Sequence, residues 1–298
     1  MAVIQYRFLL LLAIVISVLP FAEAREKPWL RISNAHFVAL TDAKEEKALK
    51  IIEELERFRV AVRQFVDISV PENAPPFRAV IFRSRNRFHK LVGAQTVAGL
   101  VMKTEDGPII VMHANKEKWL RGFAPSQVMR HEYVHVLASY HHAKYPCWYE
   151  EGFAEVLATA EIGDDFMLVG TQPEGRKRGL LAKQTTNIMM ERCHGMYGDY
   201  GKYWLFVHYL TFSGNRHAEL LRYLNLYDSG TPSLEAFKES FGTTPKEMWK
   251  DEVWHYREIP VFRVPIEMSN LDLPFTVADA DPKEIQEQLR VLEEWFSK

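Results

Sequence analysis

Cysteine is scarce in this sequence, which has only Cys147 and Cys193 among its 298 residues. Two cysteines permit at most one disulfide within the chain, and export from the cytoplasm would allow that bond to form. Cys147 precedes a segment rich in acidic residues and Cys193 precedes one rich in tyrosine, so a bridge would brace whatever lies between them. Two buried free thiols are the alternative, and the sequence leaves both open.

An excess of one sign of charge is also missing. Lys and Arg total 37 against 39 for Asp and Glu, so the formal net charge is −2. No basic patch dominates, which argues against a nucleic-acid partner. The sequence has no internal repeat and no long low-complexity tract. Its 47% of hydrophobic residues is typical of a globular protein, long enough for one large domain or two lobes.

The apolar run Phe8–Leu19 near the N-terminus is short for a membrane span. It follows Arg7 and precedes Ala22–Ala24, whose small-x-small pattern is typical of signal-peptide cleavage. We therefore predict a signal peptide at residues 1–24 and export to the periplasm or the extracellular space. Contact with a membrane is expected only through this leader if it is not cleaved, and an uncleaved anchor is the alternative.

The segment His131–His135 reads His-Glu-Tyr-Val-His and matches the pattern His-Glu-x-x-His. On a helix, residues four apart lie nearly one above the other, so His131 and His135 can point at one metal ion. Neutral imidazole suits zinc. Glu132 lies beside the same face, where it can take a proton from a water at the metal. A plain amphipathic helix with structural histidines is the alternative.

A catalytic zinc site needs a third protein ligand and leaves its fourth position to water. His141 is one candidate, because it falls on the last histidine of the metzincin signature His-Glu-x-x-His-x-x-Gly-x-x-His. Ala138 takes the place of the glycine in that signature, and alanine favours a continuing helix over a turn back to the metal. His141 is therefore the weaker candidate.

Glu151 is the stronger candidate for the third ligand. Polar residues and Pro146 end the motif helix, and Trp148–Thr159 reads as a second helix with an apolar face. Two antiparallel helices can bring Glu151 to the open side of the histidine pair. Glu155 lies one turn further on the same face, where it can accept the free ring N–H of a ligand histidine and so fix its orientation.

Together, the His-Glu-Tyr-Val-His segment and the sequence Trp-Tyr-Glu-Glu-Gly-Phe-Ala-Glu at 148–155 resemble the gluzincin zinc metallopeptidases. In that group a helix with a WxxEG-type motif follows the HExxH helix. The likeness is greatest to a bacterial family of exported peptidase-MA-like domains, and it covers about Trp29 to Tyr256. It implies one Zn²⁺ held by His131, His135 and Glu151, with a peptide or protein as substrate. Glu150 stands where the aminopeptidase branch more often has Asn, so the branch is open.

The resemblance also implies an α+β, zincin-like (thermolysin-like) fold with an N-terminal mixed sheet, one long helix, an active-site helix and a C-terminal helical lobe. We expect a catalytic domain at residues 25–258, with its sheet lobe at about 25–124 and its active-site and helical lobe at about 125–258. Residues 259–298 are expected to form a strand-helix extension. By the same resemblance, the hairpin Val97–His113 would expose a strand edge over the cleft, to which an extended peptide can add. An ordinary hairpin with a covered edge is the alternative.

Hydrophobic periodicity and end signals predict the individual elements. Strands are expected at 35–40, 77–82, 97–103 and 108–113, strand and loop at 161–186, and an extended segment at 259–268. Helices are expected at 43–65, 86–92, from about 125, and at 148–159, 202–212, 220–227, 233–241, 245–256 and 282–296.

A zinc peptidase also needs a hydrogen-bond donor beside the metal to stabilise the developing oxyanion. In the family that this chain resembles, a tyrosine at the start of a helix, a few residues before a tryptophan, occupies that place. Tyr200, which precedes Trp204, is our choice. Tyr197, Tyr203 and His194 are the other candidates, and a packing role for each tyrosine stays open.

These expectations combine into an exported zinc metallopeptidase in which Glu132 is the general base and Tyr200 stabilises the oxyanion. Two alternatives stay open. The chain could keep the fold and the metal as a cell-envelope binding or assembly protein, although an intact Glu132 argues against a purely structural site. It could instead be a zinc amidase acting on a non-peptide cell-wall bond.

Overall fold

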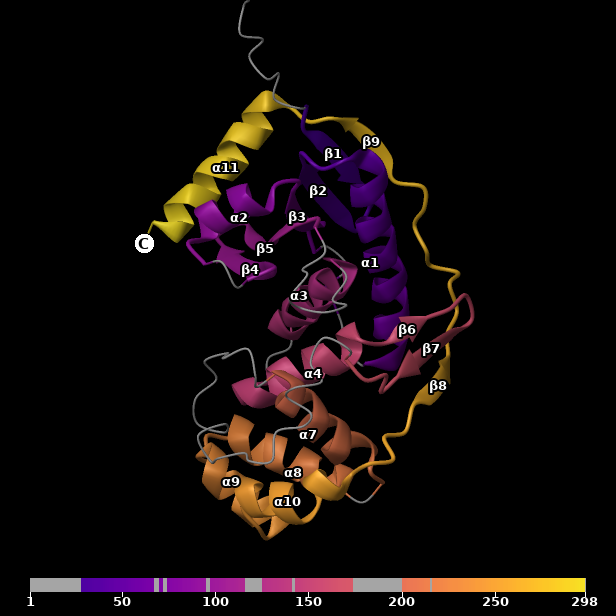
Figure 1. Ribbon diagram of the computed structural model, residues 1–298, viewed down its shortest axis with the longest axis vertical. Coiled ribbons are helices and arrows are strands. Elements are labelled where there is room, and N and C mark those ends of the chain that lie inside the picture. The colour runs from indigo at the N-terminus through magenta and orange to yellow at the C-terminus, as the bar shows by residue number, and fades with distance from the viewer. Residues whose placement is uncertain are drawn as a thin grey trace, which may run out of the picture.

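A six-stranded mixed sheet forms one end of the molecule, and helices form the other (Figure 1). The computed structural model describes residues 28–66, 70–71, 74–94, 97–115, 125–140, 143–173, 200–214 and 216–297. The protein is therefore of the mixed α+β class that the sequence predicts. Several predicted features lie outside the described residues: the signal peptide at 1–24, His141, Cys193, His194 and Tyr197.

The sheet has the strand order β4-β5-β3-β2-β1-β9. Its strands are β1 (Leu30–Ser33), β2 (Phe37–Thr41), β3 (Phe77–Phe82), β4 (Gly99–Thr104), β5 (Gly107–His113) and β9 (Thr276–Asp279). The pairs β2–β3 and β3–β5 are parallel and the other pairs are antiparallel. The sequence did not predict β1 or β9, because each has only four residues and β1 buries little besides Ile32.

Successive side chains of each strand point to opposite faces of this sheet, and each face packs into a separate core. On β3, Ala79 and Ile81 pack toward α1 (Glu45–Phe65) and α3 (Pro125–Ser139). Val80 and Phe82 face the other core, which includes Phe88 of α2 (Arg85–Val92) and Leu292 of α11 (Pro282–Phe296). Because helices cover both faces, the inner strands are almost continuously apolar.

The helical end follows α3 in the chain. Its helices are α4 (Cys147–Ala158), α7 (Tyr200–Phe212), α8 (His217–Asp228), α9 (Ser233–Phe241) and α10 (Pro245–Asp251). The predicted helix 245–256 is wrong in its second half, since the chain passes into a 3₁₀ turn at Val253–His255. The predicted starts of two helices are late, because α7 begins at Tyr200 and α8 at His217. Cys147 is disulfide-bonded, which removes the alternative of a free thiol at that position.

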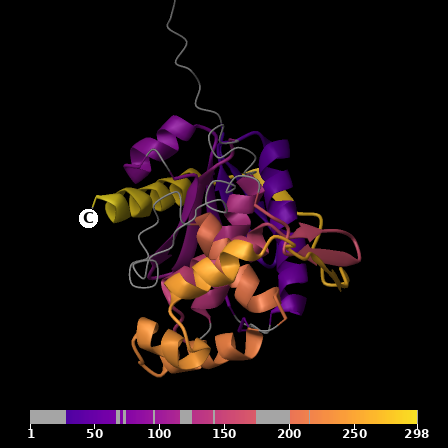
Figure 2. The same cartoon turned by 60° about the horizontal axis from the view of Figure 1, so that its bottom comes forward.

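A second sheet and the segment between β8 and β9, residues 266–275, connect the two ends. We call residues 266–275 the return segment. β6 (Glu161–Ile162) and β7 (Phe166–Val169) form a hairpin, and β8 (Phe262–Pro265) pairs with β7. The chain then runs along the outside of α1 toward β9, and α11 finally lies beside α2 (Figures 1 and 2).

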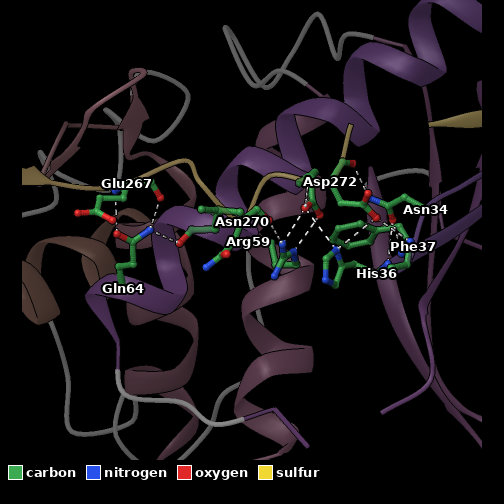
Figure 3. Close-up of polar contacts among 11 residues, drawn as sticks. Asn34, His36, Phe37, Arg59, Gln64, Glu267, Asn270 and Asp272 are labelled. Atoms are coloured by element: carbon green, nitrogen blue, oxygen red, sulfur yellow. Dashed lines mark hydrogen bonds and ion pairs between the residues drawn. The ribbon is translucent and has the colours of Figure 1, made fainter. Parts of the chain in front are cut away.

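Polar contacts fasten this return segment to α1 (Figure 3). Gln64 exchanges two hydrogen bonds of 2.8 Å with the main chain of Glu267. Arg59 donates to the carbonyl of Asn270 at 2.9 Å, and the Asp272 amide donates to Glu56 at 3.1 Å. Among the described residues, no helix is long and apolar enough to cross a membrane.

Candidate metal centre

Two histidines of α3 lie side by side, as their spacing predicts. The Nε2 atoms of His131 and His135 are 3.1 Å apart, and their ring centroids are 4.8 Å apart. The helix places residues i and i+4 on one face, so the local fold alone directs both rings to the same point. A single ion can therefore contact both imidazoles.

Glu151 reaches the same point from α4. Its Oε2 lies 3.2 Å from Nε2 of His131 and 3.5 Å from Nε2 of His135. The ligand atoms of these three residues all lie within 4.8 Å of one another. The close approach of α4 to α7 sets the position of this glutamate, since a Cβ at the next residue, Gly152, would lie 2.5 Å from the Tyr203 carbonyl oxygen.

Glu155 stands behind the cluster, where the sequence predicts an orienting carboxylate. Its side chain is fully buried, and its Oε1 lies 3.4 Å from Nδ1 of His131. A carboxylate on the Nδ1 side favours a proton on that nitrogen, which leaves Nε2 as the ligand atom. Its position is therefore suited to orienting His131 rather than to binding an ion.

Charge and burial at the cluster favour a cation among the three donors. Burial alone would lower the pKa of His131, but its hydrogen bond to Glu151 and the nearby carboxylates raise it to about 9. Burial would raise the pKa of Glu151, but hydrogen bonds from the two histidines hold it well below its usual range. The carboxylates around the two imidazoles therefore favour positive charge at this point, whether a proton or a metal ion supplies it.

Glu132 and Tyr200 line the same cavity as the cluster. Burial raises the pKa of Glu132, although the charges of His131 and His135 oppose that shift. The Tyr200 ring lies 5.9 Å from the His131 ring, centroid to centroid. Tyr203, the other described tyrosine candidate, is buried against α4 and does not line the cavity, so the fold distinguishes the two.

The cavity has a volume of about 1130 Å³ and is bounded on one side by β4. β4 is an edge strand, and its register pairs Ala98 with His113, whose amide donates to the Ala98 carbonyl at 3.4 Å. Because bonding and non-bonding pairs alternate in antiparallel ladders, the main-chain groups of Gly99, Val101 and Lys103 point away from β5. All three residues line the cavity.

Sequence reasoning missed several cavity residues, because no motif marks them. Tyr227 comes from α8, and Tyr145 comes from the segment that connects α3 to α4. Neither residue has a spacing to the HExxH motif that would indicate a shared site, and only the packing of α8 and α4 brings them there.

The donor set is compatible with a metal site, and among the described residues it is the one His/Cys/Asp/Glu cluster with the geometry to hold an ion. Two imidazoles with one carboxylate suit borderline divalent metals. His141, the alternative ligand, lies outside the described residues. No protein-family model matches the chain, and a comparison with curated protein sequences likewise finds no match.

Proposed function

We propose that this chain is an exported zinc-dependent metallopeptidase of the gluzincin type, with a zincin-like fold. The observation that carries the proposal is the convergence of His131, His135 and Glu151 in one cavity that also contains Glu132. Two histidines and one glutamate are a donor set typical of catalytic zinc sites, which leave a coordination position open. Structural zinc sites instead use four protein ligands, mostly cysteines.

Zinc in this site would lower the pKa of a coordinated water to about 7 and polarise the carbonyl of the substrate. Glu132 is the general base: it accepts the proton of the attacking water and returns it to the leaving amine. Its partly buried position supports this role, because burial raises the pKa of the carboxyl group toward the working pH of a general base. Glu155 holds the orientation of His131.

The outward main-chain groups of β4 support a peptide as the substrate. An extended peptide that adds to Gly99, Val101 and Lys103 would run along the cavity that contains the metal ligands. Main-chain hydrogen bonds of this kind align a peptide without regard to its side chains. Tyr200 then donates to the oxyanion that develops when its carbonyl is attacked.

The test begins with metal analysis of the protein that lacks residues 1–24, followed by a peptide-library digest with and without a chelator. We expect about one zinc per chain and cleavage that the chelator abolishes. Glu132→Gln should keep its zinc and its thermal stability while turnover falls by roughly 10²–10⁴-fold, the usual contribution of a positioned base.

Glu53→Gln is the matched control, because Glu53 is an exposed residue of α1 far from the cavity-lining set. It should cleave the library as the wild type does. Undiminished turnover in zinc-loaded Glu132→Gln would refute the proposed mechanism and favour a binding or assembly role. Zinc without any peptide cleavage would direct the search to other amide bonds, such as those of the cell wall.

A further inference from the structure

A second cavity, of about 350 Å³, lies on the other side of α3 from the metal cluster. At about 100° per residue, Tyr133, Leu137 and Tyr140 point away from the face that carries His131 and His135. These three residues line the second cavity, and Val136 lines both. The other lining residues come from α1, from the first residue of β3 and from the segments that precede β2 and β3: Ala35, His36, Arg59, Arg63, Val70, Pro71, Ala74, Pro75, Pro76 and Phe77.

The charged wall of this cavity is cationic. Arg59 and Arg63, one turn apart on α1, line it, and the described residues that line it include no Asp or Glu. Glu56 pairs with Arg59 at 2.7 and 2.8 Å, but Glu56 is fully buried behind it. The metal cavity differs in this respect, since its walls include Glu132, Glu150 and Glu151.

Both arginines have N–H donors for which no described residue is the acceptor. Arg59 is held in place by Glu56 and by the carbonyl of Asn270 through its Nε and Nη2 atoms (Figure 3). Its Nη1 has no hydrogen bond within the part of the chain that the structure describes. Arg63 is exposed and likewise has no hydrogen bond or ion pair with any described residue. The cavity therefore offers a fixed guanidinium and a movable one.

The hydroxyl of Tyr133 is a further hydrogen-bond donor at this cavity. The residue is only 5% exposed, and its ring packs against Phe37, Phe58 and Phe77. Its hydroxyl has no hydrogen-bond partner among the described residues, and it is accessible to solvent rather than sealed in the core. An acceptor that enters the cavity would satisfy it.

We propose that this cavity binds an organic carboxylate that carries an apolar or aromatic group. The carboxylate would accept hydrogen bonds from the guanidinium groups of Arg63 and Arg59 and from the Tyr133 hydroxyl. Planar carboxylates match the guanidinium fork, and charge-assisted bonds of this kind are among the strong ones. Phe77 and Leu137, together with the lining prolines, would contact the apolar group.

Two chemical sources of such a carboxylate need separate probes. A free aromatic acid is represented by 3-phenylpropionate, and the C-terminus of a peptide by N-acetyl-L-phenylalanine. The primary amide of each probe is the neutral control, because it keeps the shape and loses the charge. Isothermal titration of the whole chain without residues 1–24 measures all four compounds. At least one acid should bind saturably, about 10-fold or more tightly than its amide, the usual value of a charge-assisted bond.

Variants locate the binding. Arg63→Gln and Tyr133→Phe should each weaken binding of the acid by about 10-fold, and neither removes a packed side chain. Arg222→Gln is the matched control, an exposed arginine of α8 that does not line the cavity. Glu151→Gln tests whether the acid binds at the metal cluster instead, and it should leave the affinity for the acid unchanged.

Three results would overturn this assignment. The first is equal affinity for the acid and its amide. The second is loss of binding in Glu151→Gln with retention in Arg63→Gln, which would move the acid to the metal cluster. The third is the lack of saturable binding of both acids up to about 10 mM, far above the range of a functional site.

Discussion

Gly152 offers the sharpest test of how the fold positions Glu151, the proposed third ligand. In Gly152→Ala the new Cβ would lie 2.5 Å from the Tyr203 carbonyl oxygen and 2.5 Å from a Val207 methyl group. Ordinary contact begins at 3.4 Å, so α4 and α7 must separate by about 0.9 Å. Forcing a group into a packed interface costs roughly 1–3 kcal/mol. We expect that loss in the free energy of unfolding, measured with urea.

The same displacement should weaken the metal site. Glu151 is the residue before Gly152, and metal–ligand distances tolerate only about 0.2 Å. A shift of α4 by several tenths of an ångström therefore takes the carboxylate out of range of the two histidines. We expect the affinity for zinc, measured by competition with a chromogenic chelator, to fall by about 10–100-fold, the range found when a supporting group is lost.

Gly93→Ala is the control for stability alone. Gly93 caps α2 with a φ of 71°, and a Cβ there meets nothing within 4 Å. The variant should lose about 1–2 kcal/mol through backbone strain and keep its zinc affinity. If Gly152→Ala binds zinc as tightly as the wild type, the contact between α4 and α7 does not position Glu151, and our reasoning fails. Unchanged stability would refute the calculated clash itself.

Three further predictions concern other parts of the chain. Glu155→Gln should keep the fold and lower the zinc affinity by about 10–100-fold, because His131 loses the carboxylate that orients it; unchanged affinity would contradict this role. His208 is buried between the Pro260 carbonyl and the Tyr256 hydroxyl, each at 3.1 Å, and burial lowers its pKa from 6.5 to about 4. The folded state then binds fewer protons than the unfolded state, so the stability is complete above pH 6.5 and falls by roughly 3 kcal/mol as the pH drops toward 4. Urea titrations at a series of pH values should show this loss in the wild type and less of it in His208→Asn, and identical slopes would exclude the effect. Finally, N-terminal sequencing of the exported protein should begin at or near Arg25, and a full-length cytoplasmic product would disprove the signal peptide.

Helical geometry alone was enough to predict that His131 and His135 lie side by side. The spacing of His131 and His135 places both rings on one face of any helix, and α3 supplies that helix. The long helix α1 was equally predictable because its apolar periodicity is strong, and the central strands were predictable because they are apolar on both faces, between the two cores. The short strands β1 and β9 were not, since each has only four residues and, apart from Ile32, all of these residues are half-buried or exposed.

Contacts between elements that are distant in the chain decided the positions of the other candidate residues. The positions of Glu151 and Glu155 depend on the packing of α4 against α7 and α3, and the presence of Tyr200 rather than Tyr203 at the cavity depends on which side of α7 faces it. The return of the chain along α1 depends on a few hydrogen bonds to residues such as Gln64, and no sequence pattern predicts these bonds.

Tyr133 shows the difference within one motif. In the pattern His-Glu-x-x-His it occupies an unspecified position, and the sequence says only that a helix carries it. The fold turns this side chain toward α1, where its hydroxyl meets a cavity that Arg59 and Arg63 also line. The sequence determines which side of α3 carries His131 and His135, because that side depends on helical periodicity alone. The opposite side acquires its chemistry only when α1, distant in the chain, packs against it.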